Sequence, residues 1–395
     1  MKRRVFLASA LSLLAIPTAE AAKKKKSEEK NGKKSSAKNK SKNKGKSASR
    51  PAAAPANADI FNPHDGTSAS RLPPVKPAQL PENWRRFAVT FALEAPASSA
   101  PLRLSFPLPL HQTTPVHPWQ RLQQTSWQGN GAQFALAREA DREKDILRCD
   151  WPSGSAPRFS LQVELSLADR RLDVSRRTFA PEREDILRAN LAATDWLPVE
   201  DEARQLARTI LGRIIDPVAR ARALYDWVVR ECAYESGKPY GDSDIRQQIA
   251  RRQYGGGDAD INGLYITLLR AAGLPARCLA GLRLAPSRLA PSLGIADDTA
   301  TDIAAAAHCR VEFYVPGYNW IPADPADACR AIALDTLSED DARALQRLLF
   351  GFWEMNWLAL HHTENPALPP LVASREGEET PVDYICRLQG REEES

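Results

Sequence analysis

Three residues in the second half of the chain have side chains that could take part in acid–base chemistry: Asp258, His308 and Asp324. A histidine exchanges protons near neutral pH, and a neighbouring carboxylate can orient the ring for that exchange. Asp258 directly follows three glycines, His308 opens a run of alternating polar and apolar residues, and Asp324 precedes a proline. Acid–base or nucleophilic chemistry is therefore available, provided that the fold brings the three side chains together.

The residues after Asp258 predict a helix that begins at this aspartate. Apolar residues recur in steps of three and four, which is typical of one face of a helix, at Ile261, Leu264, Tyr265, Leu268, Leu269 and Ala272. Gly273 and Pro275 then end the pattern. Asp258 thus stands at the N-cap or in the first turn, where free backbone N–H groups stabilise a negative charge and lower the pKa of an acid.

His308 and Asp324 are predicted to lie on the two arms of a hairpin. The alternation over 308–315 is typical of a half-buried strand, and 316–319 is a turn sequence, Pro-Gly-Tyr-Asn. The next run, 320–325, should pair back with the first strand. Whether the two side chains share a face depends on a register that periodicity does not determine.

Together these segments resemble the transglutaminase-like superfamily over roughly residues 185–335. The resemblance implies an α+β fold with a papain-like transglutaminase core, and residues 277–283 resemble the strand that follows the nucleophile helix. It also implies that His308 is the general base, that Asp324 orients it, and that Asp258 stands where the family carries its catalytic cysteine.

An aspartate at that position predicts a pseudoenzyme. A carboxylate is a weaker nucleophile than a thiolate, and its charge opposes the oxyanion that forms in acyl transfer. None of the six cysteines can be assigned to the role. We expect a cleft that binds a peptide or a peptidoglycan strand, with no cofactor. The alternative is a hydrolase or amidase that uses Asp258, His308 and Asp324, with or without a divalent metal ion.

The N-terminus predicts export to the periplasm or secretion. Residues 1–21 have the basic start, short apolar run and small-residue end of a signal peptide, and Arg3-Arg4 resembles a twin-arginine signal. Residues 22–80 form a predicted disordered tail and linker, of which 23–50 contain twelve Lys, one Arg and two Glu. The net positive charge of this segment alone is larger than the +5 of the whole chain, so the remaining residues together carry a net negative charge. A nucleic-acid partner and a transmembrane span are not expected; the tail is either an envelope tether, binding anionic polymers or lipid head groups, or a solvated spacer.

The rest of the chain is divided by pattern. Alternating residues predict a β-sandwich over 81–180, followed by the transglutaminase-like domain over 185–335 and a C-terminal extension over 336–395. We interpret His361 and His362 as surface residues of a helix. The six cysteines allow up to three disulfides in an exported protein.

Overall fold

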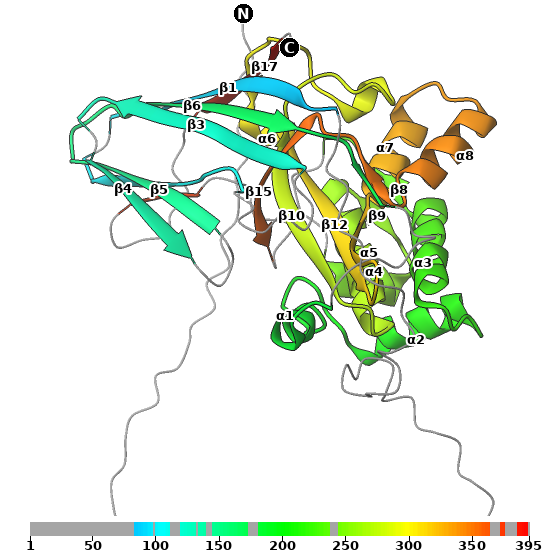
Figure 1. The fold of residues 1–395 in the computed structure, drawn as a ribbon. Coiled ribbons are helices and arrows are strands. Elements are labelled where there is room, and N and C mark those ends of the chain that lie inside the picture. The colour runs from blue at the N-terminus through cyan, green and yellow to red at the C-terminus, as the bar shows by residue number, and fades with distance from the viewer. Residues whose placement is uncertain are drawn as a thin grey trace, which may run out of the picture. The chain divides into compact units, whose positions relative to one another are not determined.

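The computed structural model describes most of the chain from residue 83 onward (Figure 1). The described residues are 83–97, 99–110, 119–131, 133–139, 144–172, 181–237, 244–363, 372–375 and 385–393. The predicted signal peptide (1–21) and the predicted tail (22–80) lie outside them. In the described part, no helix combines the length and the apolar character needed to cross a membrane.

An antiparallel sheet of four strands carries the hairpin of the candidate site. Its order is β13 (Asn319–Ala323), β12 (Ala307–Val315), β10 (Ala276–Arg283) and β15 (Trp357–Thr363). The predicted hairpin of β12 and β13 is present. The prediction that its first strand is half-buried is wrong, because every residue from His308 to Val315 is buried. The polar members of this strand are inside the protein because each has ionic partners there.

Helices cover the sheet on the side where the site lies (Figure 1). Helix α5 (Asp258–Ala271) packs on β10 and β12 and is itself surrounded by other helices, so all of its residues from Asp258 to Arg270 are buried. The remaining helical segments are α1 (Glu184–Ala189), α2 (Asp201–Leu211), α3 (Pro217–Glu231), α4 (Ile245–Arg251), η3 (Pro291–Leu293), α6 (Ile303–Ala306), α7 (Pro325–Leu334) and α8 (Glu339–Leu348). Because α5 has packing partners all around it, its start is held firmly against the sheet.

Two further antiparallel sheets lie on the other part of the molecule. One has the order β11 (Thr301–Asp302), β17 (Ile385–Glu393), β1 (Arg85–Glu94), β6 (Arg158–Leu167) and β3 (Gln120–Gly129). The other has the order β16 (Val372–Arg375), β2 (Leu102–Pro107), β5 (Lys144–Trp151) and β4 (Gln133–Glu139). Among the described residues, two short pairs complete the strands: β14 (Phe352–Trp353) with β7 (Arg170–Arg171), and β8 (Ala233–Tyr234) with β9 (Gly255–Gly256).

These two sheets share one apolar core with the site sheet. The rings of Phe91 on β1 and Phe106 on β2 meet with their centroids 4.9 Å apart, and the same core contains Leu279 and Leu282 of β10. C-terminal strands complete both sheets, since β17 pairs with β1 and β16 pairs with β2. A β-sandwich confined to residues 81–180, as a domain of its own, stays a prediction.

Gly281 is the point where β10 and β15 come too close for any side chain. A Cβ atom there would lie 2.2 Å from the carbonyl oxygen of Leu358 and 2.3 Å from the ring of Trp357, whose indole N–H donates to the carbonyl of His308 at 3.1 Å. We expect Gly281→Ala to lower the free energy of unfolding by about 1–3 kcal/mol through overpacking. Chemical denaturation measures this. Gly257→Ala is the matched control, because its nearest atom would be 3.7 Å away, and equal losses in both variants would contradict the prediction.

Candidate functional site

Glycines allow the close backbone packing that precedes the start of α5. Gly255 and Gly256 have φ values of +136° and +128°, a conformation that side chains rarely adopt. A Cβ on Gly255 would also lie 2.1 Å from the carbonyl oxygen of Ala233 on β8. Gly257 is the N-cap, and Asp258 is the first residue of the helix, as the sequence predicted.

The register of the hairpin places His308 and Asp324 on one face. Val311 pairs with Ala323, so Arg310 is level with Asp324, and His308 is two residues further along on the same side of β12. Asp324 is the N-cap of α7, where its side chain accepts the N–H of Asp327 at 3.1 Å. This register is the feature that the sequence left open.

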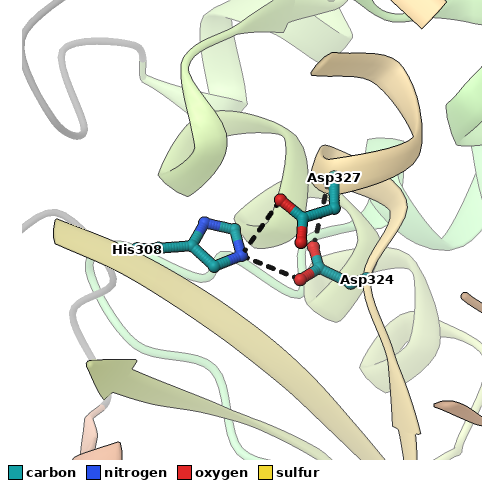
Figure 2. Close-up of side chains that lie close together, drawn as sticks. All are labelled: His308, Asp324 and Asp327. Carbon is teal, nitrogen blue, oxygen red and sulfur yellow. Dashed lines mark hydrogen bonds and ion pairs between the residues drawn. The ribbon is translucent and has the colours of Figure 1, made fainter. Parts of the chain in front are cut away.

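The imidazole of His308 lies between two carboxylates. Its Nδ1 is 2.8 Å from Oδ2 of Asp258, and its Nε2 is 2.8 Å from Oδ2 of Asp324. Figure 2 shows the Nε2 side, where Asp327 also approaches with Oδ1 at 3.4 Å. The structure thus brings together all three residues singled out from the sequence, and the side chains of Asp258, His308 and Asp324 are 6%, 0% and 0% exposed.

Asp327 and two buried arginines belong to the same cluster, although sequence reasoning missed them. Arg283, the last residue of β10, donates to Asp327 at 2.6 Å and contacts Asp258 at 3.4 Å. Arg310 contacts Asp324 at 3.3 Å and Asp327 at 3.7 Å. Arg310 could have been found, since it is two residues from His308 on an alternating strand, and Asp327 is one helical turn from Asp324. The position of Arg283 in the sequence gave no such indication that it lies in the cluster.

Two more side chains hold the carboxylates in place. Asn262, one turn after Asp258 on α5, donates to Oδ1 of Asp324 at 3.1 Å and to the carbonyl of Cys309 at 2.8 Å. Arg330 of α7 lies 3.6 Å from Oδ2 of Asp258. Apart from the carboxylate of Asp327, the neighbours of Asp324 named here donate a hydrogen bond or carry positive charge. These donors and positive charges favour the carboxylate form of Asp324.

The pKa values follow from burial and from these charges. Burial and Arg283 oppose protonation of His308, but the three carboxylates outweigh them and raise its pKa to about 9. Burial alone would raise the pKa of Asp258, yet His308, Arg283 and Arg330 lower it to about 2. Burial and the neighbouring carboxylate of Asp327 hold the pKa of Asp324 above its ordinary value. At neutral pH His308 is therefore an imidazolium that donates to both sides.

The arrangement does not suit a metal ion ligated by Asp258, His308 and Asp324. The two carboxylates meet opposite nitrogens of the ring, so one ion cannot be bound by both carboxylates and the imidazole. Ligand atoms of His308, Asp324 and Asp327 do lie within 4.8 Å of one another. A cation there would face the guanidinium groups of Arg283 and Arg310, which already neutralise these carboxylates.

Three of the described cysteines are unsuited to act as a replacement nucleophile. Burial raises the pKa of Cys329 on α7 to about 12, and it raises the pKa values of Cys232 and Cys278 well above the ordinary value. These thiols are thus protonated at neutral pH and poorly reactive. Among the described residues, five cysteines are free thiols: Cys149, Cys232, Cys278, Cys309 and Cys329.

The interpretation of His361 and His362 as helical surface residues is wrong. Both lie on strand β15, and His361 is only 9% exposed. Burial and the nearby Arg277 lower the pKa of His362 to about 3. The misreading arose because the two histidines follow an apolar run that suits a buried strand as well as a helix.

Comparison with known proteins supports the core fold. Residues 204–325 match the family model described as the transglutaminase-like superfamily. An uncharacterized protein of Haemophilus influenzae is 30% identical over 189 residues, which are 46% of this chain and 51% of that protein. The chain therefore spans about half the length of this curated relative.

Among solved structures, one supports a likeness of fold and a second is more distant. One, described as a "putative cysteine protease" of Cytophaga hutchinsonii, has a TM-score of 0.53 and 17% identity, covering 80% of this chain and 92% of that one. The periplasmic domain of TgpA from Pseudomonas aeruginosa has a TM-score of 0.35 and 19% identity, covering 63% and 91%. The α+β, papain-like core agrees with the match of residues 204–325 to the transglutaminase-like superfamily. The predicted superfamily and core fold are thus confirmed.

Proposed function

We propose that this chain is an exported, non-catalytic member of its superfamily that binds a peptide or a peptidoglycan strand at the Asp258 site. The observation that supports a non-catalytic role is the protonation state of His308. Both of its ring nitrogens are 2.8 Å from carboxylate oxygens, and its raised pKa keeps both of them protonated. A histidine in this state has no lone pair with which to accept a proton, so it is not a general base at neutral pH.

The position of Asp258 supports the loss of a nucleophile. It is the first residue of the buried central helix, and its carboxylate faces the imidazole where an activated thiol would be expected from the resemblance. A carboxylate–imidazolium pair reproduces the charges of a thiolate–imidazolium pair, so the fold tolerates the aspartate without keeping acyl-transfer chemistry. Export rests on the sequence of residues 1–21, and the contact of the tail with anionic envelope polymers stays a prediction.

A peptidic ligand is proposed because the site retains the frame of a peptide-processing fold. The Cytophaga protein, whose fold is similar, is described as a "putative cysteine protease". A protein that has lost the nucleophile but kept the surrounding side chains can still use them for recognition.

Substitution of Asp258 tests whether the site is catalytic. Cleavage or amide exchange on peptidoglycan peptides is followed by mass spectrometry for the wild type, Asp258→Ala and Asp258→Cys. We expect turnover only in the cysteine variant, at least about tenfold above the other two, because a thiol at this helix start faces His308. The double variant Asp258→Cys, His308→Ala is the control and should be inactive. Wild-type turnover that is lost in Asp258→Ala or in His308→Ala would overturn the proposal.

The second candidate function is a hydrolase or amidase that uses Asp258, His308 and Asp324, with or without a metal ion. One observation favours its metal-assisted form, namely the close approach of possible ligand atoms from His308, Asp324 and Asp327. Stoichiometric metal in the purified protein, together with wild-type turnover in the same assay, would support this candidate over the first.

A further inference from the structure

The charged side chains that contact one another at the site carry a net positive charge. Direct contacts link three carboxylates with four cations: Asp258, Asp324 and Asp327 with His308, Arg283, Arg310 and Arg330. The cluster therefore carries one unit of positive charge more than negative. Excess charge of one sign in a mostly buried cluster attracts a ligand of the opposite sign.

Arg330 is where a ligand can meet this excess charge. Its side chain is 26% exposed, whereas those of Arg283, Arg310 and His308 are 2%, 3% and 0% exposed. The guanidinium is held in place, since Nε donates to the carbonyl of Ser292 at 2.8 Å and Nη1 donates to the hydroxyl of Tyr234 at 2.6 Å. A guanidinium that is held in place on a partly exposed side chain is suited to bind a carboxylate through its remaining N–H groups.

The carboxylate of Asp258 has one oxygen that is not used within the cluster. Oδ2 accepts from His308 and Arg283, but Oδ1 is buried and has no hydrogen-bond partner among the described residues. Asp258 as a whole is 7% exposed. A buried acceptor without a partner is costly, so Oδ1 is an unfilled position for an N–H donor.

We propose that the ligand of the Asp258 site is a peptide C-terminus, whose carboxylate pairs with Arg330 and whose last amide N–H donates to Oδ1 of Asp258. This inference rests on the proposed peptide-binding function and names the part of the peptide that is recognised. In a C-terminal residue the amide nitrogen and the carboxylate carbon are bonded to the same Cα, so their partners must be neighbours. Nη1 of Arg330 is 3.6 Å from the other oxygen of the Asp258 carboxylate, which meets this condition.

The binding of small peptides to the full chain tests this inference. The probes are acetyl-Ala-Ala with a free carboxylate, in L and D forms, the same peptides as C-terminal amides, and free alanine, measured by calorimetry. We expect an acid form to bind at least tenfold more tightly than its amide. Arg330→Gln should remove this preference, and Arg330→Lys should restore part of it. Arg343→Gln, on the exposed face of α8, is the matched control and should change nothing.

The outcomes separate the inference from the function on which it rests. Equal binding of acid and amide, or an equal loss of both in Arg330→Gln, would overturn recognition of the C-terminus and leave peptide binding intact. Binding of free alanine as tight as that of the acid peptides would overturn the peptide as the ligand. Absence of binding by every probe, together with none by longer peptidoglycan peptides, would overturn the proposed binding function itself. Because the acid and amide are compared on the wild type, the test does not depend on whether a variant folds.

Discussion

Replacing Asp324 by alanine is expected to lower the free energy of unfolding by about 3–5 kcal/mol. This fully buried carboxylate contacts His308 and Arg310, so its removal leaves buried positive charge without its partner. The same change removes the cap of α7, because Oδ1 accepts the N–H of Asp327. Urea-induced unfolding at pH 7 measures the loss through the transition midpoint and its slope.

Two variants define how this result is interpreted. Asp324→Asn keeps an oxygen for the helix cap but lacks the charge, so it should lie between the wild type and Asp324→Ala. Asp340→Ala removes one of the two acidic partners of Arg343 on α8, where the aspartate side chain is 93% exposed, and should cost less than about 1 kcal/mol. A loss of the same small size in Asp324→Ala would show that the cluster does not stabilise the fold.

Raising the pH from about 6.5 to about 9 is expected to remove about 3 kcal/mol of stability that depends on His308. Its pKa is about 9 in the folded protein and near 6.5 when unfolded, so the folded state holds the proton more tightly. The contribution is complete below pH 6.5 and is lost as the pH rises through 9. Burial and Arg283 oppose this charge, and Asp327, Asp324 and Asp258 favour it.

The pH dependence is measured by repeating the urea titration at several pH values. His308→Gln is the control, since it carries no titrating group at this position, and its stability should vary much less over the same range. The contribution of Asp258 to stability has the opposite dependence on pH and changes at acidic pH. Its pKa of about 2 lies below the ordinary 3.8, so its contribution is present above pH 4 and is lost as the pH falls toward 2. A wild-type stability that is flat between pH 6.5 and 9 would contradict the assigned charge of His308.

Local pattern was enough to predict the elements of the site. The start of α5 at Asp258, the hairpin of β12 and β13, and the turn between them all follow from residues close in sequence. Helix periodicity, glycines and turn residues act over a few positions, so a single sequence carries this information. The three predicted residues do lie together, with the carboxylates of Asp258 and Asp324 on either side of the imidazole of His308.

Residues that are close in sequence thus specify the identity of these elements and place an aspartate at the start of the central helix. The packing of whole elements sets the register that places Asp324 level with Arg310, and it places Arg283 between Asp258 and Asp327. It also decided that C-terminal strand β17 pairs with β1. These contacts join segments that are distant along the chain, and their geometry depends on how whole elements pack. Periodicity within one segment contains no information on that packing.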